Sequence, residues 1–166
     1  MKTKLIDKLK FLEVITYGNI FLRSGVSSGV YARIKKAYGN PELLGIISPY
    51  FYEIVDKNIT CVAGTGVGGI PLATAYSIAY QIPLCIVRDE IKKHGMQEPI
   101  EGYVPTKKDK VVILDDVYTS GSSLMDTEKI LQTTGAEIIQ GCVILARNKP
   151  DIYFPVKSIL NLEDLL

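Results

Sequence analysis

Apolar residues near the start of the chain recur at helical spacing and are then interrupted by short runs. The spacing over Leu5–Val14 predicts a first short helix. Asn40-Pro41-Glu42 is typical of a helix start, because it combines a capping side chain, a proline at the first helical position and an acid in the first turn. Short strands are expected between these helices, at Ile20–Leu22 and Val30–Ile34. One apolar face follows the second helix start and comprises Leu43, Leu44, Ile47, Tyr50, Phe51, Ile54 and Val55.

From residue 59 onward the pattern changes to short apolar runs that alternate with helices. It predicts strands at Ile59–Ala63, Leu84–Val87, Val111–Leu114 and Ile138–Leu145, and helices at about Ile70–Tyr80 and Ser122–Thr134. Repeated strand, glycine-containing turn and helix predict an α/β fold with a doubly wound, mostly parallel sheet. Ligands bind such sheets at the carboxyl ends of the strands. Binding residues are therefore expected just after Ala63, Val87 and Leu114.

Length and composition favour one globular domain over residues 1–166. Hydrophobic residues make up 47% of the chain, charged residues make up 22%, and the formal net charge is +1. This balance gives no reason to expect nucleic-acid or membrane partners, and no apolar run approaches the ~20 residues that a spanning helix needs. The cysteines, Cys61, Cys85 and Cys142, lie in apolar runs without metal-ligand spacing, so buried reduced thiols and a cytoplasmic location are expected.

The run Val111–Leu124 carries the most informative chemistry. Four apolar residues predict a buried strand, and Asp115 and Asp116 follow at a position where burial of an unpartnered carboxylate would be costly. The next residues, Thr119-Ser120-Gly121-Ser122-Ser123, form a turn that opens a helix. Free backbone N–H groups, hydroxyls and the positive end of the helix dipole make such a turn an anion site, best suited to a phosphate.

Carboxylates followed by a phosphate cradle describe a ligand with hydroxyls at one end and a phosphate at the other, such as a ribose phosphate. Asp115 and Asp116 would accept hydrogen bonds from the ribose hydroxyls, while the turn would hold the phosphate. The simpler alternative is that Thr119 and Ser120 cap the helix and the acids lie in a loop. A Walker A loop is not indicated, because no lysine follows Gly121 at the required spacing.

Two further segments suggest a highly charged ligand. Glycines at positions 64, 66, 68 and 69 would let the backbone approach a pyrophosphate closely, although a tight turn without a ligand would also use them. After Val87, a polar stretch contains Arg88, Lys92, Lys93 and His94, the only histidine of the chain. A mobile loop with these groups would close over a charged leaving group and exclude water. A solvated charge run is the alternative.

The run Val111–Leu124 resembles the phosphoribosyl pyrophosphate motif of type I phosphoribosyltransferases. Nearly the whole chain is similar, in the same order, to orotate phosphoribosyltransferases. Tyr17–Tyr31 resembles their N-terminal hood, and Val62–Ala73 resembles their pyrophosphate loop. Val87–Gly95, continuing to Ile100-Glu101-Gly102, resembles their mobile catalytic loop.

The resemblance implies a type I phosphoribosyltransferase fold, with a small hood and N-terminal helix over about residues 1–35 and a core over about 40–166. It implies transfer of a ribose phosphate from phosphoribosyl pyrophosphate (PRPP) to a ring nitrogen of orotate. Magnesium ions (Mg2+) would bind through the substrate and reach Asp115 and Asp116 only through water. A homodimer is implied, because the mobile loop of this family reaches into the neighbouring subunit's site.

The resemblance also assigns individual residues. Catalytic roles are implied for Arg88, Lys92, His94, Asp115 and Asp116. Substrate contacts are implied for Arg23, Tyr31, Gly64, Thr65, Gly68, Gly69, Lys93, Thr119, Ser120, Gly121, Ser122, Ser123 and Arg147.

Several positions depart from the pattern of the family. Arg23 replaces a lysine of the hood, Asp89 stands where a second basic residue is typical, and Gly68 stands where some members have a lysine. Arg147 is expected to face the orotate carboxylate, but its neighbours Asn148-Lys149 are altered, and a surface arginine is the alternative. Two other functions therefore stay open: transfer to another base (a purine or a modified pyrimidine), or a non-catalytic regulator that senses PRPP.

Overall fold

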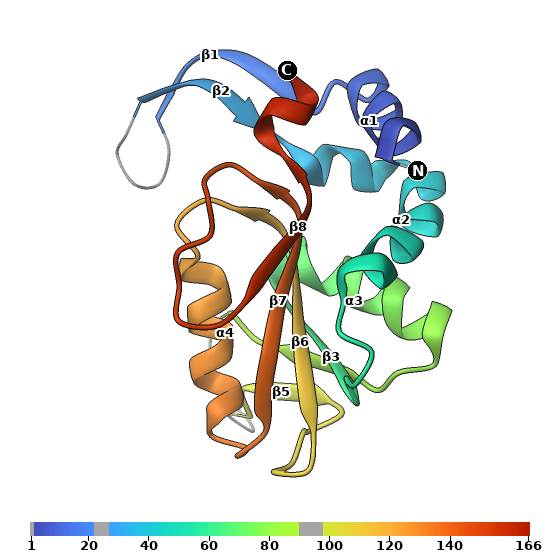
Figure 1. Ribbon diagram of the computed structural model, residues 1–166, viewed down its shortest axis with the longest axis vertical. Coiled ribbons are helices and arrows are strands. Elements are labelled where there is room, and N and C mark those ends of the chain that lie inside the picture. The colour runs from blue at the N-terminus through green and yellow to red at the C-terminus, as the bar shows by residue number, and fades with distance from the viewer. Residues whose placement is uncertain (1, 22–26, 90–97) are drawn as a thin grey trace.

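A six-stranded sheet forms the centre of the molecule. The computed structural model describes residues 2–21, 27–89 and 98–166. The strands are β3 (Cys61–Thr65), β4 (Leu84–Val87), β5 (Ile100–Gly102), β6 (Lys110–Tyr118), β7 (Glu137–Ala146) and β8 (Val156–Asn161). They lie in the order β5-β4-β3-β6-β7-β8 (Figure 1). Only β5 runs antiparallel to its neighbour among these strands, so the predicted mostly parallel sheet is confirmed.

Helices cover both faces of this sheet. The covering helices are α2 (Pro41–Ile54), α3 (Gly66–Tyr80) and α4 (Ser122–Gln132), while α1 (Lys2–Phe11) lies beside the C-terminal 3-10 helix η2 (Leu162–Leu165). In Figure 1, α4 lies on one side of the sheet, and α2 and α3 lie on the other. The buried strand residues divide in the same way: Val112 and Leu114 join the core cluster of α2 and α3, whereas Val111 and Ile113 join that of α4. Because alternate strand residues point to opposite faces, this apolar run is buried on both sides.

The start of α2 follows its predicted signal, whereas α1 begins at Lys2 rather than Leu5 and α3 at Gly66 rather than about Ile70. The Asn40 side chain accepts a hydrogen bond from the Leu43 backbone N–H at 3.3 Å, and a proline and an acid follow in the first turn of α2. α1 ends at Phe11 rather than at Val14, because the chain turns at Glu13, whose φ is 50°, and Val14 then enters the core.

A separate two-stranded sheet precedes the core. Its strands, β1 (Ile15–Phe21) and β2 (Ser27–Ala32), pair antiparallel. β1 begins before the strand predicted at Ile20, and β2 stops at Ala32 instead of continuing to Ile34. Ile34 begins a 3-10 helix, η1 (Ile34–Gly39), because its side chain and that of Ala37 are buried in the core.

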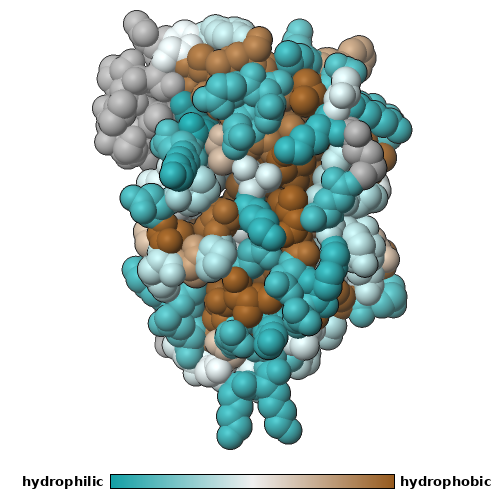
Figure 2. Space-filling view, in the orientation of Figure 1, coloured by the Kyte–Doolittle hydropathy of each residue, from teal (hydrophilic) through white to brown (hydrophobic). Residues whose placement is uncertain are grey.

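The surface shown in Figure 2 is mostly hydrophilic, with smaller apolar areas between the polar side chains. Over the described parts of the chain, no helix combines the length and the apolar character needed to cross a bilayer. All three cysteines are buried free thiols, as predicted.

Candidate active site

The two acids predicted to follow the central strand lie within it. β6 continues to Tyr118 instead of ending at Leu114, because its pairing with β7 continues that far. Asp115 and Asp116 are only 6% and 4% exposed. Two adjacent buried carboxylates are costly unless other groups stabilise them, which marks this pair as a functional candidate.

The surroundings of the two acids differ. Asp116 Oδ2 lies 2.7 Å from the Lys35 ammonium, which donates a hydrogen bond to it. Asp115 Oδ1 accepts a hydrogen bond from the Asp116 backbone N–H at 2.8 Å. Burial, followed by the negative charge of Asp116, raises the pKa of Asp115 to about 7, while a hydrogen bond from the Ser123 side chain opposes the rise. Asp115 therefore lies close to a protonation change at neutral pH.

The stability of the free protein is expected to fall as pH rises through this range. The folded-state pKa of Asp115 lies above its ordinary value of 3.8, so the folded protein keeps a proton that the unfolded chain has already lost. The stabilisation is complete below the unfolded pKa and is lost as pH rises toward about 7, by up to about 1.4 kcal/mol per pH unit. Urea unfolding of the wild type and Asp115→Asn across this range measures the effect. In Asp115→Asn the free energy of unfolding should depend much less on pH than in the wild type. An equal pH dependence in both proteins would contradict the raised pKa of Asp115.

The short helix η1 supplies two site residues that sequence reasoning missed. Lys35 reaches Asp116 as described, and the Tyr38 hydroxyl donates a hydrogen bond to the Gly68 carbonyl at 2.8 Å. Burial, with smaller effects from the Asp116 and Asp115 charges, raises the pKa of Tyr38. The basic run Arg33–Lys36 was the available signal, but its pattern does not show which lysine turns toward the acids.

The glycines after β3 allow close packing within the protein. A Cβ on Gly68 would lie 2.5 Å from Asp116 Oδ1 and 2.7 Å from Asp115 Oδ1. A Cβ on Gly69 would lie 2.4 Å from the Leu114 carbonyl oxygen, and one on Gly64 would lie 2.7 Å from the Gly69 carbonyl oxygen. The sequence suggested a ligand as the reason for these glycines. The structure gives a second reason, since they let the start of α3 lie against the acid-bearing strand.

The Thr119–Ser123 turn leads from β6 into α4. Its N-cap residue is Gly121, with φ of 81°, which has no side chain to cap the first-turn N–H groups. The Ser120 hydroxyl donates a hydrogen bond to Ser122 Oγ at 3.2 Å and accepts a longer one from the Ser122 backbone N–H at 3.5 Å. Neither Thr119 nor Ser120 is therefore the N-cap residue that the simpler alternative required. Gly121 adds no side-chain cap, so the positive end of the α4 dipole favours an anion at this turn.

The residues after β4 bring a charged pair and an acid to the carboxyl ends of the strands. The Arg88 guanidinium pairs with Glu101 of β5, while its Nε is buried without a hydrogen-bond partner among the described residues. The next residue, Asp89, accepts a hydrogen bond from the Thr65 hydroxyl at 2.6 Å. The predicted site residues Arg23, Lys92, Lys93 and His94 lie outside the described residues.

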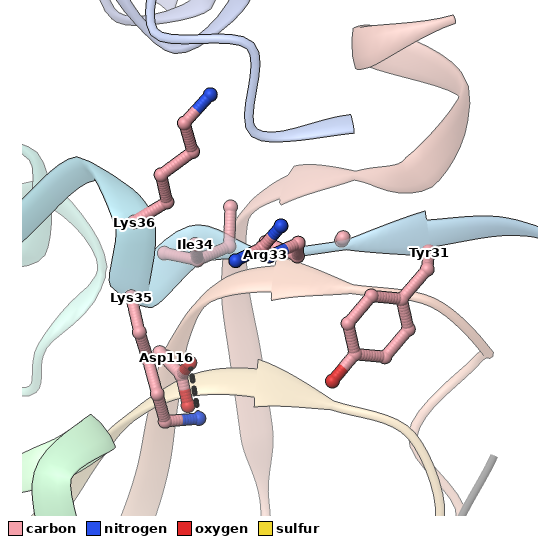
Figure 3. Close-up of a pocket in the computed structure, with 7 residues that line it drawn as sticks. Tyr31, Arg33, Ile34, Lys35, Lys36 and Asp116 are labelled. Carbon is pink, nitrogen blue, oxygen red and sulfur yellow. Dashed lines mark hydrogen bonds and ion pairs between the residues drawn. The ribbon is translucent and has the colours of Figure 1, made fainter. Parts of the chain in front are cut away.

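A pocket of about 180 Å³ lies where the hood meets the core (Figure 3). It is lined by Tyr31, Ala32, Arg33, Ile34, Lys35, Lys36 and Asp116. In Figure 3, Lys35 lies against Asp116, whereas Lys36 extends away from it. The pocket lining carries both signs of charge, because Arg33 and Lys35 lie beside Asp116, while Lys36 pairs with Glu13.

Arg147 connects the core to the hood. Its guanidinium Nη2 donates a hydrogen bond to the Val30 carbonyl of β2 at 2.8 Å, and its backbone N–H donates to the Tyr118 carbonyl at 2.9 Å. Arg147 is therefore half-buried and bound to the hood backbone, while its contact with an orotate carboxylate stays a prediction. The structure gives Arg147 a defined task in holding the hood strand beside the acid-bearing strand.

These features can hold a sugar phosphate with a charged leaving group. The buried acids offer acceptors for hydroxyls, the turn offers donors for a phosphate, and the ends of β3 and β4 offer a second anion site. Within the described ranges, no cluster of three or more His, Cys, Asp or Glu side chains is placed to hold a metal ion.

Comparisons with known proteins agree with this geometry. Residues 35–163 match the family described as phosphoribosyl transferase domain. The chain is 39% identical to an orotate phosphoribosyltransferase of Methanocaldococcus jannaschii over 88% of this chain and 82% of that protein. It is 37% identical to a relative of the same name from Pyrococcus horikoshii over 90% and 81% of the two chains. Its structure is similar to that of orotate phosphoribosyltransferase from Aeropyrum pernix, with a TM-score of 0.84 and 25% identity over 97% and 95% of the two chains.

Proposed function

Because this chain belongs to the phosphoribosyltransferase family, among the orotate phosphoribosyltransferases, we propose that it transfers 5-phosphoribosyl from PRPP to orotate. The products are orotidine monophosphate and pyrophosphate. The observation that carries the proposal is the buried pair of acids on β6. The same strand leads into the Thr119–Ser123 turn, which is of a type that binds phosphate. A ribose 5-phosphate lying along this edge would meet the acids with its hydroxyls and the turn with its phosphate.

The reaction breaks the bond between the anomeric carbon of the ribose and the pyrophosphate oxygen, and a ring nitrogen of orotate bonds to that carbon. Positive charge develops on the ribose and negative charge on the departing pyrophosphate. Asp115 and Asp116 would orient the sugar through its hydroxyls and stabilise its positive charge. Their low exposure matters, because charge interactions are stronger where water is excluded.

Departure of pyrophosphate needs donors at the ends of β3 and β4. The glycine-rich start of α3 would supply backbone N–H groups at the positive end of a helix dipole. Arg88 would contribute through its buried Nε, which has no partner among the described residues. Lys92, Lys93 and His94 complete this set in our proposal, and a loop that carries them would also exclude water.

We also propose that PRPP binds together with Mg2+. The Asp115 and Asp116 carboxylates fit this ion, which prefers oxygen ligands and keeps several water molecules. When bound, the ion would supply charge neutralisation of the pyrophosphate. The two carboxylates would hold it through water, with Lys35 balancing the charge of Asp116 in the free protein.

The pocket beneath the hood is the proposed site of the base. Tyr31 would flank the ring, and Arg23 and Arg147 would face the orotate carboxylate. One observation favours a second candidate function, transfer to another base: the Arg147 guanidinium already donates to the Val30 carbonyl. If this bond persists in the complex, Arg147 has fewer N–H groups left for a carboxylate.

An absorbance assay of orotate consumption tests the main proposal. The decrease in orotate absorbance should require both PRPP and Mg2+. It should be absent with Asp116→Asn, which serves as the inactive control. A panel of purines and modified pyrimidines, assayed alongside, tests the second candidate. Turnover of another base but not of orotate would contradict the orotate assignment. Binding of PRPP without turnover of any base would instead support a PRPP-sensing regulator.

We propose a homodimer in which the loop after β4 completes the neighbouring site. Mixing His94→Ala with Asp116→Asn should then restore activity, although each variant alone is inactive. A mixed dimer has one site with neither substitution, so an equal mixture should reach about a quarter of the wild-type rate. Light scattering gives the mass of the assembly. A monomer, or a mixture that stays inactive after subunit exchange, would contradict loop exchange.

The remaining parts of the proposal concern organisation and location. Residues 1–166 would form one domain, with about 1–35 as hood and N-terminal helix and about 40–166 as core. A cytoplasmic location is supported by the cysteines, since buried free thiols are typical of a reducing compartment.

A further inference from the structure

Asp89 places a carboxylate against the loop that is proposed to bind pyrophosphate. Its Oδ1 accepts a hydrogen bond from the Thr65 hydroxyl at 2.6 Å. Its Oδ2 lies 2.7 Å from the position that a Cβ on Gly66 would occupy. Gly66 is the first residue of α3 and has a φ of 56°. The carboxylate therefore lies directly beside the first turn of this helix.

An anion is expected at this place, since the first-turn N–H groups and the helix dipole attract negative charge. Among the residues that the structure describes, the Asp89 carboxylate is the negative group closest to Gly66. The preceding residue, Arg88, directs its guanidinium to Glu101 of β5 rather than to Asp89. A pyrophosphate group that enters the loop must thus come within a few ångströms of a negative side chain.

Building on the proposed function, we propose that Asp89 is a specificity-determining residue, which makes this loop accept the metal-complexed pyrophosphate group of the donor and reject the metal-free form. Metal-free pyrophosphate carries its full negative charge toward the Asp89 carboxylate, and like charges repel at this distance. A divalent cation on the pyrophosphate reduces that charge before it reaches the loop. The acid thereby couples donor binding to the metal.

Calorimetry with inorganic pyrophosphate tests the inference without relying on turnover. Wild type and Asp89→Asn are titrated with pyrophosphate in a chelator and, separately, with the magnesium complex. The variant should bind metal-free pyrophosphate about tenfold more tightly, while affinity for the complex changes much less. Added salt should reduce the difference between the two proteins, because Asp89 is exposed.

Glu53→Gln provides a matched control for net charge. Glu53 is an exposed acid near the end of α2. This helix ends beside the amino-terminal half of β7, whereas Asp89 lies at the carboxyl ends of the strands. This variant should bind both forms of pyrophosphate as the wild type does. If Glu53→Gln tightens metal-free binding as much as Asp89→Asn, overall charge explains the effect and the inference is overturned.

Other outcomes separate the inference from the proposed function. Unchanged metal-free affinity in Asp89→Asn, or failure of the wild type to bind either form, overturns the role of Asp89 even in an active enzyme. If Asp89→Asn shows the expected change in affinity but the wild type does not turn over orotate, the role of Asp89 stands and orotate is not the acceptor. Circular dichroism of Asp89→Asn confirms that the variant is folded, as expected for an exposed side chain.

Discussion

Replacing Asp116 with asparagine is expected to lower kcat by about a hundredfold to a thousandfold, while the protein stays folded. Asp116 is 4% exposed, and its carboxylate is the group that would stabilise positive charge on the ribose. Asparagine keeps the shape and removes the charge, so the loss should appear in kcat more than in KM. Initial rates at saturating PRPP and orotate measure the effect, and circular dichroism checks the fold.

The same chemical change at an exposed position provides the control. Asp126 on α4 has a side chain that is 72% exposed and pairs with Lys129 one turn away, an arrangement that contributes little to stability. Asp126→Asn should keep the wild-type rate. A comparable loss of kcat in both variants, or an Asp116→Asn enzyme with more than about a tenth of the rate, would show that the acid does not act on the reacting sugar.

Replacing Gly69 with alanine is expected to reduce the free energy of unfolding by about 3 kcal/mol. The new Cβ would lie 2.4 Å from the Leu114 carbonyl oxygen, a backbone atom of β6. Neither α3 nor the central strand can shift without disturbing the packing on both sides of the sheet, so the strain exceeds the gain in helix propensity. Urea unfolding, extrapolated to zero denaturant, measures the change.

Gly45→Ala is the matched control for this substitution. Gly45 lies in the interior of α2, is exposed, and has nothing within 4 Å of the place where a Cβ would be added. Alanine there should stabilise the protein by about 0.5–1 kcal/mol, because it lowers the entropy of the unfolded chain. A stabilising Gly69→Ala, or equal effects at both positions, would contradict the packing role assigned to the start of α3.

The centre of the sheet was predictable, but its edges were not. The apolar run after residue 110 predicts a strand because its side chains must be buried on both faces. β5 has only three residues, and β8 alternates buried and exposed positions weakly, so neither gives a signal of its own. Both strands form because a neighbouring strand offers hydrogen-bond partners. The sequence likewise predicts too early an end for β6, since an acid usually ends a strand, whereas Asp115 continues the pairing with β7.

The site was predictable where several signals coincide along the chain. The acids, the turn and the glycine loop each lie next to a predicted strand, and the structure brings them to one edge of the sheet. Lys35 and Tyr38 could not be found in this way, because they reach the site from a 3-10 helix far away in sequence. Nor does any pattern show that Arg147 donates to the hood backbone.

The join between hood and core has a consequence for how such proteins can diverge. The matched family region begins at Lys35, so the two-stranded sheet precedes it. The join is closely packed among the described residues: Leu5, Leu9 and Val14 are buried in the same core cluster as α2, Lys8 pairs with Glu42, and the Val30 carbonyl accepts a hydrogen bond from Arg147. Changes confined to β1 and β2 could alter the accepted base, since Lys35 and Tyr38, which contact the acid-bearing strand and the glycine loop, lie on η1 outside these strands. The two strands of the small sheet, rather than the buried α1, are therefore the part of the chain where acceptor preference can change at the least cost to the fold.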